Sequence, residues 1–195
     1  MNKHFLYTFM ISIFLNTIAQ AQSDNKELKL KVTNLGLSVQ VYPAGIIPTV
    51  NLEQYLTKRS SLVYRLGANI VDRQDFSAEN DEEKGGGFGA SIGYRIHYPL
   101  QNGEIIAGIN MDVWNLWIDW RDKLPFQNMT SGTTYTLVLQ PWLETGYFFH
   151  LKNSNSKIGI TTGFGREINT IVDGKQVAQD WIASVTVQYV LSLNK

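Results

Sequence analysis

Cysteine is absent from all 195 residues of this chain. A disulfide scaffold, a thiolate metal site and a cysteine nucleophile are therefore excluded. Charge is also scarce, because 17% of the residues are Asp, Glu, Lys or Arg, against about 25% in an ordinary soluble domain. The 17 basic and 17 acidic residues cancel, so no net positive charge attracts nucleic acid, and we expect no nucleic-acid partner.

The chain also has no apolar run long enough for a membrane-spanning helix. The mostly apolar stretch 5–18 is shorter than the ~20 residues that a spanning helix needs. It follows a basic start at Lys3 and precedes Ala19-Gln20-Ala21, the small-x-small pattern that signal peptidase cleaves. We therefore expect residues 1–21 to be a cleaved signal peptide and residues 22–195 to form one exported domain.

Alternation of apolar and polar residues dominates the rest of the sequence. In the last such stretch, Val185 and Val187 alternate with Ser184, Thr186 and Gln188. Successive side chains of a strand point to opposite faces, so this period of two predicts strands that separate two environments. Eight stretches show it, at residues 30–42, 47–57, 62–72, 87–98, 104–120, 135–151, 157–169 and 181–193.

Two places interrupt the alternation. In 104–120 the apolar residues change parity near Trp114-Asn115, which places Leu116 and Ile118 out of phase and predicts a β-bulge. In 135–151 Pro141 has no N–H for a central ladder, which predicts a local bulge or edge irregularity.

The connections alternate in length from the second stretch onward. Those at 58–61, 99–103 and 152–156 are short, whereas those at 72–86, 121–134 and 170–180 are long. The exception is 43–46, which is short where a long connection is expected. This asymmetry predicts an antiparallel up-and-down meander with both termini at the short-turn side, which in outer-membrane barrels faces the periplasm.

The chemistry of the two faces indicates what they contact. The polar face consists mainly of Gly, Ser, Thr, Asn and Gln, without the mixed charges of a water-facing surface. The apolar face is bounded by aromatic residues, which favour a lipid interface. We expect this girdle to comprise Trp114, Trp117, Trp120 and Trp181 near the long loops and Tyr98, Tyr147 and Tyr189 near the short turns. The predicted fold is all-β, an eight-stranded antiparallel up-and-down transmembrane β-barrel.

In these respects residues 30–193 resemble the small eight-stranded outer-membrane barrels of Gram-negative bacteria, the OmpA, OmpX and OmpW type. The last strand is similar to the family's assembly signal, with Tyr189, Leu191 and Leu193 outward, although it ends in Asn194-Lys195 rather than an aromatic residue. The resemblance implies an outer-membrane location, contact with outer-membrane lipid, recognition by the outer-membrane assembly machinery, and a monomer. The three long loops would contact an unidentified extracellular ligand.

Charged residues of inward parity predict an ion-pair network, because eight strands enclose just enough space for side chains. Glu53, Arg65 and Arg95 fall at similar depth toward the short turns, where we expect them to form one inward ion-pair cluster. Asp112, Glu144 and Glu167 fall higher, and His97 and His150 fall lower. Charges inside a barrel must be paired to offset their desolvation, so we expect a structural role. A proton path or gated channel is the alternative.

The expected function is that of an envelope structural or surface-interaction protein without a cofactor, metal site or enzymatic activity. Two alternatives stay open. A lipid A-modifying enzyme would pair a base with a hydroxyl nucleophile, but neither His97 nor His150 belongs to a His-x-Ser motif. A secreted lipocalin-like carrier would share the eight strands but turn the apolar face inward.

Overall fold

The structure is a computed structural model that describes residues 32–74, 81–122, 130–152 and 154–193. The predicted signal peptide, the middle of two long loops and Asn194-Lys195 lie outside these ranges. The part of the chain that the structure describes contains no helix long and apolar enough to cross a membrane. Its strands are β1 (Val32–Tyr42), β2 (Gly45–Thr57), β3 (Ser60–Gln74), β4 (Glu82–Leu100), β5 (Gly103–Asp122), β6 (Thr130–His150), β7 (Ser156–Arg166), β8 (Ile168–Asp173) and β9 (Trp181–Ser192).

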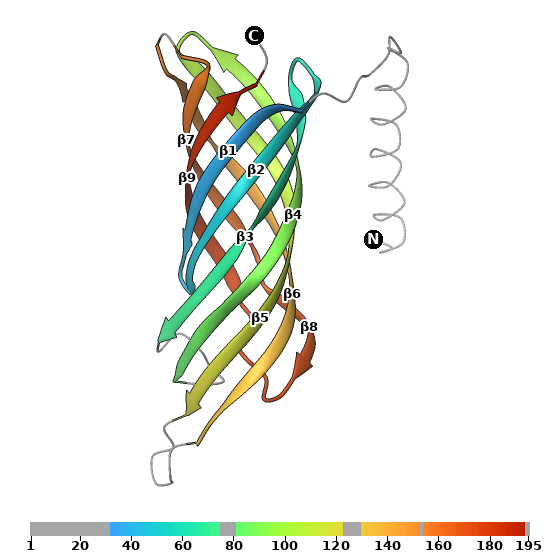
Figure 1. Cartoon of the computed structure of the whole chain (residues 1–195), viewed down its shortest axis with the longest axis vertical. Coiled ribbons are helices and arrows are strands. Elements are labelled where there is room, and N and C mark those ends of the chain that lie inside the picture. Colours follow the sequence, from blue (N-terminus) through green and yellow to red (C-terminus); the bar gives the residue numbers. More distant parts are fainter. Residues whose placement is uncertain (1–31, 75–80, 123–129, 153, 194–195) are drawn as a thin grey trace, which may run out of the picture. The chain divides into compact units, whose positions relative to one another are not determined.

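The strands form a closed antiparallel ring. Each of β1 to β5 pairs with the next in sequence, β5 pairs with β6, β6 with β7 and β8, β7 with β9, and β9 with β1. Because β7 and β8 both pair with β6, they are two segments of one strand of the barrel wall, which is why nine labelled strands make an eight-stranded barrel. The predicted eight-stranded up-and-down barrel is therefore confirmed. Figure 1 shows tilted strands, with β4, β5 and β6 reaching far past the β1–β2 turn at the end remote from the C-terminal end of β9.

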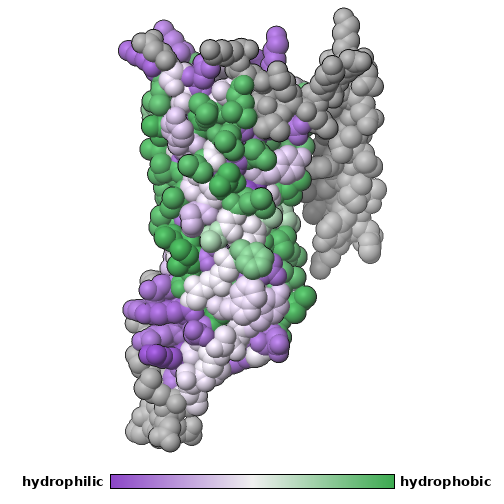
Figure 2. Space-filling model, in the orientation of Figure 1, coloured by the Kyte–Doolittle hydropathy of each residue, from purple (hydrophilic) through white to green (hydrophobic). Residues whose placement is uncertain are grey.

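The alternation places apolar side chains outward on every long strand. Leu37 on β1, Leu66 on β3 and Phe88 on β4 are 59, 66 and 62% exposed, and many other outward apolar side chains are more than a third exposed, whereas their sequence neighbours face the interior. On the face that Figure 2 shows, hydrophobic residues occupy a broad zone between hydrophilic residues toward the two ends. A band of this kind is stable against lipid rather than water.

Strand β5 corrects one prediction. Its ladders with β4 and β6 run from Gly103 to Asp122 without a register shift, so no bulge lies at Trp114-Asn115. Leu116 and Ile118 point inward and are 2% exposed. The backbone parity is unchanged, and it is the polarity of the two faces that reverses: toward the long-loop end the interior becomes apolar and the outer surface becomes polar.

The second irregularity lies in the strand that pairs with Pro141. Pro141 itself pairs in register with Met111 of β5. On its other side, the β6–β7 ladder stops at Gly165 and the β6–β8 ladder starts at Ile168. Since Pro141 offers no N–H, the neighbouring strand breaks beside it, and Glu167 turns into the barrel, where it is 4% exposed.

Candidate functional site: the barrel lumen

The long-loop end of the lumen is filled by an apolar cluster. It combines side chains from six strands, the β1–β2 turn and the connection between β8 and β9: Tyr42, Ala44, Ile47, Val71, Trp114, Leu116, Ile118, Val138, Val177 and Ile182. Trp114 is 1% exposed and its indole N–H donates to Gln140 Oε1 at 3.2 Å. The cluster closes this end of the barrel with apolar surface.

A buried ionic triad ties this cluster to the wall. Arg73 of β3 contacts Glu167 at 2.9 Å and Glu83 of β4 at 3.5 Å. All three side chains are more than nine-tenths buried. A buried charge is tolerated only with such partners, so the triad connects β3, β4 and the β7–β8 break.

Below the apolar cluster lies an Arg65 layer. The Arg65 guanidinium donates to both oxygens of Asp112, at 2.9 and 2.7 Å, and to Gln40 Oε1 at 3.0 Å. The Trp142 indole N–H donates to Asp112 Oδ1 at 2.9 Å. The centre of the Trp142 ring lies 4.8 Å from Cζ of the Arg65 guanidinium. Asp112 is completely buried, so this bidentate pair is what compensates its desolvation.

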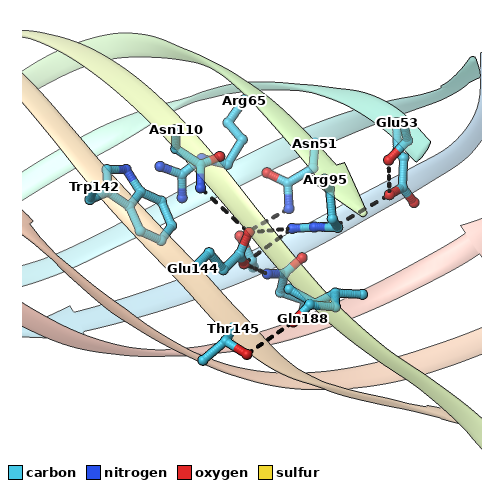
Figure 3. Close-up of polar contacts among 12 residues, drawn as sticks. Asn51, Glu53, Arg65, Arg95, Asn110, Trp142, Glu144, Thr145 and Gln188 are labelled. Carbon is cyan, nitrogen blue, oxygen red and sulfur yellow. Dashed lines mark hydrogen bonds and ion pairs between the residues drawn. The ribbon is translucent and has the colours of Figure 1, made fainter. Parts of the chain in front are cut away.

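An Arg95 layer follows toward the short-turn end. Arg95 donates to both oxygens of Glu144, at 3.1 and 2.9 Å, and to Glu53 at 3.4 Å. Figure 3 shows Arg95 lying between Glu53 and Glu144, with the amides of Gln188 and Asn110 pointing at Glu144. One guanidinium thus links β2, β4 and β6 across the lumen.

The third layer, near the short turns, is centred on Lys157 and Glu104. The Lys157 ammonium donates to Glu104 Oε1 at 2.5 Å and lies 3.6 Å from Glu53. It also lies 4.8 Å from the centre of the Phe148 ring, a cation–π contact. The three layers together occupy the lumen with side chains from at least six strands, and each cation contacts a carboxylate.

One part of this layer has the contact pattern of a catalytic triad. His97 Nε2 lies 2.8 Å from Ser61 Oγ, and His97 Nδ1 lies 3.1 Å from Glu104. A hydrolase needs such a nucleophile, base and orienting acid, with the nucleophile open to substrate. Ser61 is completely buried, and its hydroxyl also donates to Glu53 at 2.9 Å. The arrangement is therefore a hydrogen-bond network within the lumen.

The structure distributes the six predicted network residues over these layers. Arg65 lies with Asp112, Arg95 with Glu53 and Glu144, and Glu167 with Arg73. The expected single cluster of Glu53, Arg65 and Arg95 is thus divided between two layers, because Arg65 pairs with Asp112 instead. The sequence prediction missed four further charged members: Arg73, Glu83, Glu104 and Lys157. Inward parity was the signal that could have found them, but each lies close to a strand end or in a stretch read as loop. His97, which has the predicted inward parity, lies in the third layer.

The predicted aromatic girdle is divided between the two faces. Trp117, Trp181, Tyr98 and Tyr189 lie on the outer surface and are 46 to 60% exposed, and Tyr147 lies there half-buried against Phe149. The prediction is wrong for Trp114 and Trp120. Both have the inward parity of β5, and the Trp120 indole packs against the apolar cluster and donates to Thr134 Oγ1 at 3.2 Å. Phe88 and Tyr135 flank Trp117 instead, with ring centres 5.9 and 5.4 Å away.

The short-turn end differs from the closed long-loop end. A recess of about 550 Å³ opens there, lined mainly by polar residues that include Tyr55, Glu104, His150 and Lys157. His150 is exposed at this mouth rather than buried in the lumen. Within the described ranges, no group of three or more His, Asp or Glu side chains is placed to hold a metal ion.

No protein-family model and no curated protein matches this sequence. Among solved structures, Neisserial surface protein A is similar, with a TM-score of 0.55 and 6% identity over 83% of this chain and 96% of that chain. The N-terminal β-barrel domain of Pseudomonas aeruginosa OprF aligns over 83% of this chain and 98% of that chain (TM-score 0.43, 9% identity). Outer membrane protein AlkL, studied in DMPC lipid bilayers, aligns over 88% and 95% (TM-score 0.45, 9% identity).

The fold assignment rests on the first of these likenesses and on the closed ladder. The chain has the fold of the small outer-membrane β-barrels, and its outer band is apolar, as theirs must be.

Proposed function

We propose that the chain is an integral, monomeric protein of the bacterial outer membrane that acts as an envelope structural or surface-interaction protein and not as a diffusion pore. The observation that carries the proposal is the filled lumen. Three layers of paired charges and one apolar cluster occupy the interior that a pore would leave open. An eight-stranded barrel has no room for a second, aqueous path beside them.

The surface-interaction role is supported by the unequal lengths of the strands. Strands β4, β5 and β6 have 19, 20 and 21 residues, whereas β1 has 11 and β9 has 12. Beyond the outward aromatic row at Trp117, the outer faces of β4 and β5 carry Lys84, Asp119 and Arg121. Charged side chains belong in water, so this three-stranded extension stands clear of lipid on the side that we assign to the cell exterior. It would present the loops at 75–80 and 123–129.

The third predicted loop, 170–180, does not support such a role. Its first part is the end of β8, and in its second part Val177 is buried in the apolar cluster and Ala178 is buried beside it. A surface partner would therefore meet the β4–β6 extension rather than this connection.

Conductance in a planar lipid bilayer tests the filled lumen. The purified, refolded chain should give no steady single-channel current, whereas a large porin measured alongside should give open steps. Heat-modifiable migration on a denaturing gel, run on the same sample, checks that the barrel is folded. Stable unitary conductance from a folded sample would contradict the proposal.

Carbonate extraction separates the proposal from the carrier alternative. The protein should stay in the membrane pellet, because its outer band is apolar. A lipocalin-like carrier would be released into the supernatant.

A further inference from the structure

The connection between β8 and β9 enters the barrel instead of projecting from it. Val177 and Ala178 are 3% and 7% exposed; Val177 belongs to the apolar cluster at the long-loop end, and Ala178 lies beside it next to Leu116 and Val138. Their neighbours in the segment, Lys175 and Gln176, are exposed. Residues 174–180 thus place two small apolar side chains into the recess that the surrounding strands form at this end of the lumen. We call this recess the cup.

Side chains of the wall hold this segment mainly by its backbone. The Ala178 N–H donates to Glu83 Oε1 at 3.0 Å, Asn169 Nδ2 donates to Val177 O at 3.0 Å, and Thr134 Oγ1 donates to Lys175 O at 2.7 Å. None of the ladder pairs of the described strands includes residues 174–180. Removing the segment from the cup would therefore break one backbone hydrogen bond beside the ladders, from the Glu167 N–H to Asp180 O at 2.9 Å, and no pair within them.

The space beneath the cup is polar. Four deeply buried atoms there, Gln40 Nε2, Gln140 Nε2, Ser184 Oγ and Thr186 Oγ1, have no hydrogen-bond partner among the described residues. Buried polar atoms of this kind are satisfied by internal water. The apolar cluster consequently separates these polar side chains from the solvent at the long-loop end.

We propose that residues 174–180 form a displaceable plug that closes this end of the lumen through the docking of Val177 and Ala178. Gly174 has φ +124°, a conformation that L side chains rarely adopt, and it provides the turn from β8 into the plug. Docking gains two small apolar side chains, a few hydrogen bonds and the partly exposed contacts of Lys175 with Asp122 and Trp120, against the ordering of seven residues, so the net free energy of docking is small. The proposal rests on the proposed function only for the orientation of the barrel.

Single-cysteine labelling tests the plug, and the absence of native cysteine removes any background. The reporter is Val138→Cys on β6, a position that is 1% exposed within the cup. A water-soluble maleimide is added to the folded protein in lipid nanodiscs. With the native plug we expect slow labelling that reaches completion, because the plug opens at intervals. A second substitution, Val177→Asp, should accelerate labelling by about tenfold or more, since an aspartate cannot return to an apolar cup.

Gln176→Asp is the matched control, because it adds the same charge to an exposed position of the same segment and should leave the labelling rate unchanged. Val177→Gly serves if the aspartate variant does not fold, and it should also accelerate labelling. An unchanged rate in a folded Val177 variant would show that the segment does not close the lumen. No labelling at all with the native plug would show that it is not displaceable. Transient opening of the plug is distinct from a steady pore. A native protein that shows no bilayer conductance can therefore still be tested by labelling.

Discussion

At the scale of single residues, the lumen shows how charge is kept inside a barrel. Arg65, Arg95 and Lys157 each contact at least one carboxylate within 3.0 Å, and two of the three also lie over an aromatic ring within 5 Å. Isolated buried charges would be strongly unfavourable, whereas hydrogen-bonded pairs in this environment offset the cost of desolvation. The pairs therefore act as units, and removing one partner harms stability by stranding the other.

Arg65→Ala should destabilise the barrel by about 3 kcal/mol, because Asp112 would remain completely buried without its bidentate cation. Urea unfolding of the protein in lipid vesicles measures the change. Arg121→Ala is the matched control, since that guanidinium is 63% exposed and 4.0 Å from Glu82, and it should change stability by no more than about 0.5 kcal/mol. An Arg65 variant with unchanged stability and a new ion conductance would support the gated-channel alternative.

At the scale of elements, the sequence predicted the strands well and one face of β5 poorly. Period-two alternation located all eight wall positions, because each strand separates lipid from a polar interior over most of its length. The prediction failed where that contrast reverses. Leu116 and Ile118 are apolar yet inward, since the long-loop end of the lumen is apolar, while Asp119 on the same strand is outward in water. Polarity alone cannot reveal parity beyond the edge of the membrane.

The glycines of β4 are a second feature at this scale, and the alternation of apolar and polar residues does not explain them. Gly89 pairs with Trp114 across the β4–β5 ladder. A β-carbon at Gly89 would collide with the Val113 carbonyl and with the Trp114 ring. The missing side chain is thus what lets the indole lie flat in the lumen.

Gly89→Ala should therefore cost about 1 to 3 kcal/mol of unfolding free energy through overpacking, measured by the same urea unfolding. Gly36→Ala on β1 is the comparison, because its new β-carbon would lie 3.2 Å from the nearest atom, the Tyr189 carbonyl oxygen. It should cost less than about 1 kcal/mol. Equal effects at the two positions would argue against the Trp114 contact as the cause.

At the scale of the whole molecule, the lumen is polar and ion-paired toward the short turns and mainly apolar toward the long loops. The inward positions of the candidate site could be predicted from alternation, but their partners could not. Which residues meet across a lumen depends on strand tilt and shear, and these bring Arg73 and Glu167 together from 94 positions apart. The inward-folded connection 174–180 was also unpredictable. Only the burial of Val177 and Ala178 shows that it folds inward, and no pattern in the sequence indicates that burial.

The central claim is that the alternating faces of each strand separate lipid from a packed lumen, and a spin-label scan of β9 tests it most directly. Single cysteines replace residues 182–189 in turn, and collisions of the label with oxygen and with a water-soluble nickel complex are measured in lipid vesicles. We predict high oxygen collision rates at Ala183, Val185, Val187 and Tyr189, and low rates with both reagents at the intervening positions, which are 1 to 6% exposed. High nickel collision rates at the odd-numbered positions, or no alternation at all, would show that the two faces of β9 do not separate lipid from a packed lumen.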